Sequence, residues 1–206
     1  AVELLVASGL LPVVLPELRD LAPASADAGA SPAWQTTMSI LRRLQTSRFS
    51  VVLAALLRES SGGTRVVEPL CRRLKLTGAD RKETEFLLEH ESTIRASRRV
   101  PWPQLQRILI QDGAADLLSY GRAVAEVLDG HTADIDYATQ QFTQPSDQLN
   151  PPPLISGEDL HRLGIPAGPA YKSILDAVRD AQLERRIRSS NEALELAQQL
   201  SSQLPS

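Results

Sequence analysis

The 206-residue chain is predicted to fold as an all-α protein, on three observations. Leucine and alanine are abundant while aromatic residues make up only 4% of the chain, a balance that favours helices over strands. Apolar residues recur at helical spacing, and no stretch alternates apolar with polar residues. Capping patterns, such as Thr77 with Asp80, precede several of the periodic segments.

The first half of the chain is predicted to form helices separated by glycine and proline. The expected helices cover residues 2–6, about 33–44, 49–57 and 66–74, and a longer one opens at residue 77. The segment Phe49–Leu57 is almost wholly apolar and has no internal turn signal, so we interpret it as a buried helix. Pro12 suits the start of a helix, and Gly62-Gly63 ends one.

Prolines divide the second half in the same way. Pro101-Trp102-Pro103 ends one helix and starts the next, and the run Pro151-Pro152-Pro153 indicates a linker near residue 150. Further helices are expected up to residue 109, after Asp112-Gly113 and over residues 132–144. The last two helices carry apolar stripes at Tyr171, Ile174, Leu175, Val178 and Ala181, and at Ala193, Leu196, Ala197, Leu200 and Leu204.

The composition bounds the class of protein. The single cysteine, Cys71, cannot form an internal disulfide, which favours a reducing, cytoplasmic compartment. No apolar run is long enough to span a membrane, so no membrane partner is expected. The net charge of −3 gives no overall attraction to nucleic acid, and RNA contact would require a local basic patch. The chain opens at Ala1 inside a helical pattern, so we expect an excised or processed piece.

Two distant segments carry a recognisable motif. The segment PPPLISGEDLHRLGIPAGPAYKSILDAVRDAQL contains the motif residues Gly157, Asp159, Leu160, Gly164, Ile165, Gly168 and Pro169. Near the N-terminus the matching residues are Gly9, Leu10, Leu11, Leu15, Pro16, Glu17 and Leu18. In this order and spacing the residues resemble the C-terminal part of bacterial tRNA nucleotidyltransferases, the family of CCA-adding enzymes and poly(A) polymerases.

This resemblance implies a neck remnant over residues 1–21, an HD-like helical body over 22–150 and a C-terminal helical tail over 151–206. It implies that the chain binds and positions tRNA, or another RNA 3′ end, for the protein's own N-terminal catalytic head. Mg²⁺ and ATP or CTP would belong to that head, so the resemblance implies no catalytic residue and no cofactor in this chain. CCA addition and poly(A) addition both fit the resemblance.

An HD-type domain holds its metal through a His on one helix and an adjacent His-Asp pair on another. The middle of the chain resembles such a domain, with Thr36 near the first position and Arg58-Glu59 at the second, and an arginine stays protonated and cannot ligate a metal. We therefore expect a degenerate HD-like scaffold without a metal. Asp134-Ile135-Asp136 is interpreted as the acidic start of a helix and not as a metal site. An HD-class phosphohydrolase and a helical protein–protein interaction module are the alternative functions.

The histidines and the cysteine offer no clear site. His90, His131 and His161 are not spaced as ligand pairs, and His90 is expected to be a hydrogen-bonded core residue. Cys71 precedes Arg72-Arg73, which would lower the pKa of its thiol. A half-buried, unreactive Cys71 is the favoured interpretation.

Three basic groups are candidates for RNA contact because a guanidinium group donates two hydrogen bonds to one phosphate. They are Arg72, Arg73 and Lys75; Arg95, Arg98 and Arg99 with Arg107 one helix on; and Arg185 and Arg186 with Arg188. The alternative is a solvated helix face with ion pairs, which Glu184 supports for the third group. The second group is favoured, because its basic run has no acidic neighbour in the sequence.

The turn at Gly168-Pro169 is a further candidate for anion contact. A helix that starts at Pro169 is expected to leave the N–H groups of Ala170, Tyr171 and Lys172 free. Lys172 departs from the family pattern, which usually has glycine near this position.

Overall fold

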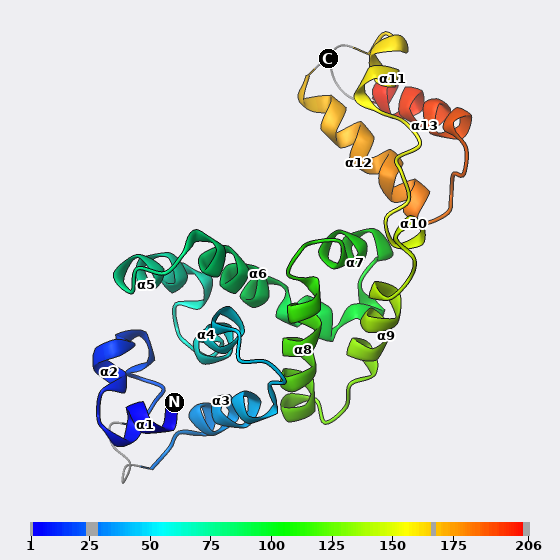
Figure 1. The fold of residues 1–206 in the computed structure, drawn as a ribbon. Coiled ribbons are helices and arrows are strands. Elements are labelled where there is room, and N and C mark those ends of the chain that lie inside the picture. The colour runs from blue at the N-terminus through cyan, green and yellow to red at the C-terminus, as the bar shows by residue number, and fades with distance from the viewer. Residues whose placement is uncertain (1, 24–28, 166–167, 204–206) are drawn as a thin grey trace. The chain divides into compact units, whose positions relative to one another are not determined.

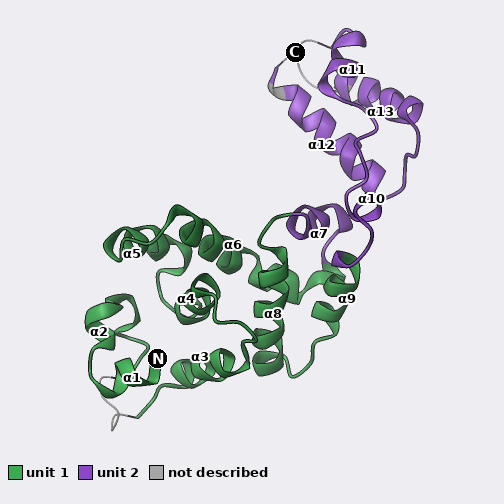
Figure 2. Cartoon of the chain, in the orientation of Figure 1, with its two compact units in different colours: residues 1–99, 111–141 green, residues 100–110, 142–206 purple. Residues whose placement is uncertain are grey.

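The computed structural model describes residues 2–23, 29–165 and 168–203. Within these ranges every regular element is a helix, so the all-α prediction is confirmed (Figure 1). Each of the three expected domains, residues 1–21, 22–150 and 151–206, includes some residues that the structure does not describe. Leu204 of the last expected apolar stripe is one of these residues. The chain divides into two compact units, residues 1–99 with 111–141 and residues 100–110 with 142–206, which Figure 2 colours separately.

The first unit is built around one apolar helix. Its elements are α1 (Val2–Ala7), α2 (Leu11–Val14), the 3₁₀ turns η1 (Pro16–Leu18), η2 (Gly63–Val66) and η3 (Ser97–Arg99), α3 (Pro32–Arg43), α4 (Phe49–Leu57), α5 (Val67–Arg73), α6 (Gly78–Arg95), α8 (Ala114–Leu128) and α9 (Ala133–Phe142). α4 has the bounds predicted from the sequence, and most of its side chains are buried. α3, α6 and α8 pack against it, as Figure 1 shows.

Two contacts bring α8 close to its neighbours. Tyr120 is fully buried, and its hydroxyl group donates a 3.4 Å hydrogen bond to the carbonyl oxygen of Ala54 in α4. A Cβ atom at Gly121 would lie 2.8 Å from Ile94 Cγ2 and 3.0 Å from Ile135 Cδ1. Glycine at this position therefore allows α8 to approach both α6 and α9. α6 itself begins with the predicted capping box of Thr77 and Asp80.

The second unit contains α7 (Trp102–Leu109), α10 (Ser146–Leu149), α11 (Gly157–Arg162), α12 (Pro169–Leu183) and α13 (Ser190–Gln203). α12 packs against α7, α11 and α13. The core between these helices includes Ile155, Leu160, Ile165, Ile174, Val178 and Ala181. The predicted apolar stripe of α12 therefore faces the core of this unit.

Side-chain amides attach the segment before α11 to the helices of the second unit. The buried Gln106 of α7 donates through Nε2 to the carbonyl oxygen of Leu149 at 3.0 Å. Gln182 of α12 donates through Nε2 to the carbonyl oxygen of Pro152 at 2.8 Å.

Among the described helices of the chain, none combines the length and the apolar character that crossing a membrane requires.

We predict a pH-dependent contribution of the capping box at α11. The backbone N–H of Ser156, and then its hydroxyl group, donate to Asp159 and hold the pKa of that carboxyl group below its ordinary value. Asp159 therefore stabilises the fold above its ordinary pKa of about 3.9, and this contribution is lost as pH falls through the lower folded-state value. Thermal unfolding followed by circular dichroism should show a lower melting temperature for Asp159→Asn at neutral pH.

The difference between wild type and Asp159→Asn should shrink as the solution is acidified. Glu158→Gln provides the control, because Glu158 is exposed in the same first turn and pairs with the exposed Arg162 across the helix surface. A constant difference between wild type and Asp159→Asn at every pH would contradict the assignment.

Candidate nucleic-acid interface

The turn η3 presents two arginines on a fixed backbone. The buried hydroxyl group of Ser97 donates to the carbonyl oxygen of Asp134 at 2.5 Å, and the N–H of Arg98 donates to Asp134 Oδ1 at 3.1 Å. These bonds attach the turn to the first turn of α9. The side chains of Arg98 and Arg99 are exposed, and neither forms an ion pair with any residue in the described ranges.

Arg95 is different, and the expectation that it lacks acidic neighbours is wrong. Its Nη1 atom donates to both carboxylate oxygens of Asp129 at 2.8 Å, and its Nε atom pairs with Glu91, one turn earlier in α6. Burial opposes the charge on Arg95, but the hydrogen bonds that it donates to these two carboxylates raise its pKa above the ordinary value. Asp129 is far away in the sequence, which is why a local count of acidic residues missed it.

Glu91 connects Arg95 to Arg58 of the Arg58-Glu59 pair. Its side chain is only 7% exposed and lies between Arg95 and Arg58, whose Nε atom is 3.3 Å from Glu91 Oε2. Arg58 also pairs with Glu59. The guanidinium groups of Arg58 and Arg95 thus compensate the charge of the buried Glu91 carboxylate. The Thr36 hydroxyl group donates to the carbonyl oxygen of Pro32, one turn earlier in its own helix.

The first basic group is only partly available. Arg73 binds Glu17 through two contacts of 2.7 and 2.9 Å and donates to the carbonyl oxygen of Val14. Arg72 pairs with Glu68 on the exposed surface of α5. Lys75 is exposed and has a positive φ of 54°. The structure therefore gives Arg73 a role in attaching α5 to η1.

Arg107 belongs to the second unit and is also paired. Its Nη2 atom lies 2.6 Å from Asp180 Oδ1 and 4.0 Å from Asp176 Oδ1, both on α12. The pairing joins α7 to α12. Direct phosphate contact by Arg107 would require it to leave these carboxylates.

The third group lies at the C-terminal end of α12. Arg186 pairs with Glu184 at 2.7 Å, as the sequence alternative anticipated. Arg185 is exposed and has a positive φ of 61°, and its N–H donates to the carbonyl oxygen of Gln182. RNA contact by Arg185 stays a prediction, as it does for Lys75, Arg98 and Arg99.

The expected anion site at the start of α12 has one free N–H group fewer than the sequence predicted. α12 begins at Pro169, and the N–H of Tyr171 donates to the carbonyl oxygen of Gly168 at 3.0 Å. The expectation of a free N–H at Tyr171 is therefore wrong. Lys172 is exposed in this first turn.

The motif residues of the second unit have local structural roles. Gly157 and Asp159 lie in the first turn of α11, which Ser156 and Asp159 cap, and Leu160 is fully buried. Gly164 ends α11 with a φ of 76°, a conformation that glycine adopts without steric cost. Ile165 is buried, and its carbonyl oxygen accepts a 2.7 Å hydrogen bond from Tyr171. The motif therefore encodes a helix–turn–helix connection.

The other candidate chemical groups have ordinary structural surroundings. Asp134 and Asp136 lie in the first turn of α9, as predicted, where Asp136 binds Arg122 and Thr132 and has a lowered pKa. His90 is half-buried, with its ring 4.8 Å from that of Phe86. Cys71 is buried, and burial raises the pKa of its thiol, so the expected effect of Arg72-Arg73 is absent.

Two further findings concern the chain as a whole. Within the described ranges, no group of three or more histidine, cysteine, aspartate or glutamate residues is arranged to hold a metal ion. Comparisons with protein-family models, with curated proteins and with solved structures find no match to this chain.

One residue that sequence reasoning did not single out is Arg179 of α12. Its guanidinium group donates to Gln182 Oε1 at 2.9 Å and to Asn150 Oδ1 at 2.8 Å, which are both neutral acceptors. No ion pair to Arg179 occurs within the described part of the chain. In the sequence Arg179 lies between aspartates at positions 176 and 180, so nothing there indicated an uncompensated charge.

We predict that Arg95 is needed for stability and Arg98 is not. Arg95→Ala leaves the largely buried Glu91 with one cation instead of two and frees Asp129, so the free energy of unfolding should fall by about 3 kcal/mol. Arg98→Ala removes an exposed side chain and should change it by less than about 0.5 kcal/mol. Urea denaturation measures both values. Equal effects of the two substitutions would show that the Glu91 ion pairs do not stabilise the fold.

We also predict that glycine is better tolerated than alanine at positions 75 and 185, where the backbone has a positive φ. Lys75→Gly and Arg185→Gly should each raise the free energy of unfolding by up to about 1 kcal/mol, because glycine adopts a positive φ without steric cost. The matched variants Lys75→Ala and Arg185→Ala keep that cost and should give no gain. Chemical denaturation that ranks alanine above glycine at either site would contradict the backbone conformation described here.

Proposed function

We propose that this chain is the RNA-binding and positioning part of a nucleotidyltransferase that adds nucleotides to tRNA or other RNA 3′ ends. The proposal is supported by the family resemblance of its two motif segments, at residues 9–18 and 153–183. The single observation in the structure that supports an RNA contact is η3, where Arg98 and Arg99 project from an attached turn without a carboxylate partner in the described ranges.

The geometry of η3 suits a phosphate backbone. Each guanidinium group can donate two parallel hydrogen bonds to phosphate oxygens. Because Ser97 and Asp134 already hold the turn, binding would order only the two arginine side chains and not the backbone. An arginine that is already compensated, such as Arg95, would have to give up a carboxylate before it could bind a phosphate.

Five further candidate cations could contact RNA in the proposal, each within its own unit. Lys75 and Arg185 follow helix C-termini, and Lys172 lies in the first turn of α12. Arg72 and Arg186 have exposed carboxylate partners, and such surface pairs cost little to exchange for a phosphate. Affinity rests on a few local contacts, because the net charge of −3 opposes RNA over the rest of the surface.

In this proposal the chain carries out no chemical step of its own. Nucleotide transfer, with its Mg²⁺ and ATP or CTP, belongs to a separate catalytic head. The function of the chain is to hold the RNA at a fixed distance from that head, and both CCA addition and poly(A) addition fit this function.

We predict that charge reversal at η3 weakens RNA binding selectively. Arg98→Glu together with Arg99→Glu should lower the affinity for tRNA at least about tenfold at moderate salt. It should also make the salt dependence shallower, by roughly 1.5 to 2 in the slope of log affinity against log salt concentration. Helicity should be unchanged, because both side chains are exposed. Salt-titrated fluorescence anisotropy with a labelled tRNA measures the affinity and the slope.

The control is the double variant Arg19→Glu with Arg65→Glu. It makes the same change in net charge at two exposed arginines of the first unit that are outside the candidate groups. Equal losses of affinity in the two variants would show a non-specific charge effect and contradict a contact at η3. A lack of any salt-sensitive tRNA binding would instead favour an interaction module, for which the exposed side chains of Leu4 and Val13 are candidate contacts.

A further inference from the structure

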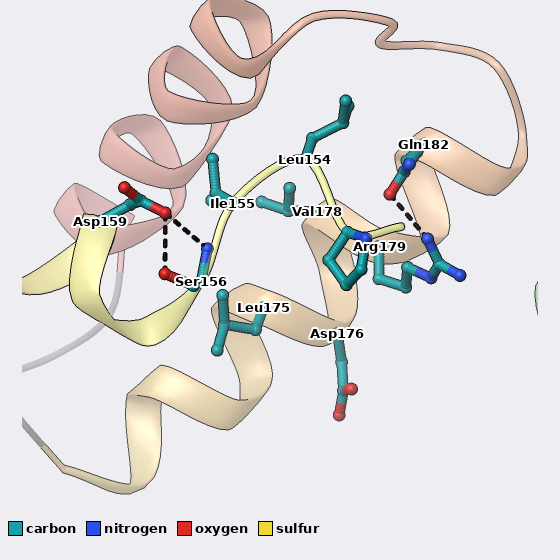
Figure 3. A pocket seen from close by; sticks show the side chains of 10 residues that line it. Leu154, Ile155, Ser156, Asp159, Leu175, Asp176, Val178, Arg179 and Gln182 are labelled. Carbon is teal, nitrogen blue, oxygen red and sulfur yellow. Dashed lines mark hydrogen bonds between the residues drawn. The ribbon is translucent and has the colours of Figure 1, made fainter. Parts of the chain in front are cut away.

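A pocket in the second unit has no role in the proposed RNA contact. It has a volume of about 510 Å³ and lies between the extended segment at residues 153–156 and α12, as Figure 3 shows. Its walls are mainly apolar and include Leu154, Ile155, Leu175 and Val178. A pocket of this size and character is typical of small-molecule sites in proteins.

Arg179 gives the pocket one cationic wall. Its two hydrogen bonds go to Gln182 and Asn150, which carry no charge, and three of its five N–H groups have no hydrogen-bond acceptor among the described residues. In Figure 3 the guanidinium group lies beside Gln182, at one end of the row of apolar side chains. The guanidinium group is therefore oriented by neutral partners and keeps donors for an incoming oxyanion.

The distribution of charge along α12 leaves Arg179 uncompensated. The helix carries two aspartates next to this arginine, Asp176 and Asp180, and both direct a carboxylate oxygen to Arg107, at 4.0 and 2.6 Å. Burial, and then the nearby positive charge of Arg107, lower the pKa of Arg179. An anion in the pocket would relieve both effects.

The other polar groups of the pocket select the kind of anion. Asp159 and Asp176 also line it, so a doubly charged phosphate would meet two carboxylates for one available guanidinium group. A carboxylate carries a single charge, and its planar shape matches the guanidinium fork. The apolar walls in turn require an apolar body next to that carboxylate.

We propose that this pocket binds a small monoanionic carboxylate with an apolar body. The carboxylate binds Arg179, and the body packs against Leu154, Leu175 and Val178. Two sources present the same chemistry: a free alkyl carboxylic acid, and the C-terminal residue of a peptide that ends in a leucine-like side chain. The site is separate from η3 and does not depend on the proposed RNA function.

The test uses the ¹⁵N-labelled full chain and four probes. Octanoate represents the free acid, and an acetylated tripeptide ending in leucine represents the peptide. Octanamide is the neutral control for octanoate, and adenosine monophosphate carries the rival phosphate. Amide shifts at Leu154, Ile155, Val178 and Gln182 should saturate with octanoate or with the peptide, and the tighter of the two identifies the source. Octanamide and adenosine monophosphate should bind at least about tenfold more weakly, because a charge-assisted hydrogen bond contributes that much.

Substitutions then assign the binding to Arg179. Arg179→Gln keeps a donor of similar shape but removes the charge, and should weaken carboxylate binding about tenfold or more. Arg179→Lys keeps the charge but not the planar fork, so it should bind carboxylate more weakly than wild type and more tightly than Arg179→Gln. Arg186→Gln is the matched control, an exposed arginine of the same unit away from the pocket, and should bind like wild type.

Three results would overturn the proposal. One is the absence of saturable shifts with either carboxylate probe. Another is binding of octanoate that is equal in Arg179→Gln and in wild type, which would make the pocket merely apolar. The last is tighter binding of adenosine monophosphate than of either carboxylate, which would assign the pocket to a phosphate ligand.

Discussion

The first unit depends on covering α4 on every side. Phe49–Leu57 is apolar around almost its whole circumference, so the helix is stable only when protein replaces water on each face. α3, α6 and α8 supply that cover, and Gly121 allows α8 to come close to α6 and α9. Once α6 and α9 are fixed in this way, Ser97 of η3 meets Asp134, and the exposed arginines follow. The burial of the apolar helix α4 thus determines where the exposed arginines of η3 lie.

The features predicted correctly from the sequence are those that depend on near neighbours. α4 was predicted to the residue, because an unbroken apolar run between turn signals has few other solutions. The capping box at Thr77 needs only residues three apart. Ion pairs between distant segments were not predictable in this way, because Asp129 reaches Arg95 and Glu17 reaches Arg73 only after distant helices pack. Local scarcity of acidic residues therefore says little about whether a basic group is free.

Ion pairing in the folded chain separates the basic residues into two kinds. Arg73, Arg95 and Arg107 join elements, and their charges are already compensated. An arginine of this kind contributes little to the binding of a ligand, because each new hydrogen bond replaces one that it already makes. Arg98 and Arg179 retain donors, although neither was distinguished from its neighbours by the sequence pattern. The charges that a fold leaves uncompensated are therefore better candidates for binding than the densest basic runs.

The motif residues of the second unit also have structural roles, and this limits what they indicate about ligand binding. Asp159 caps α11, Leu160 fills the core, and Gly164 permits the turn, so each is explained by the local fold. Residues with such roles explain the local fold and do not by themselves indicate a ligand contact. An RNA site or a ligand pocket would then be formed by side chains that the scaffold leaves exposed. This is why the two proposed sites rest on Arg98, Arg99 and Arg179, which are not motif residues.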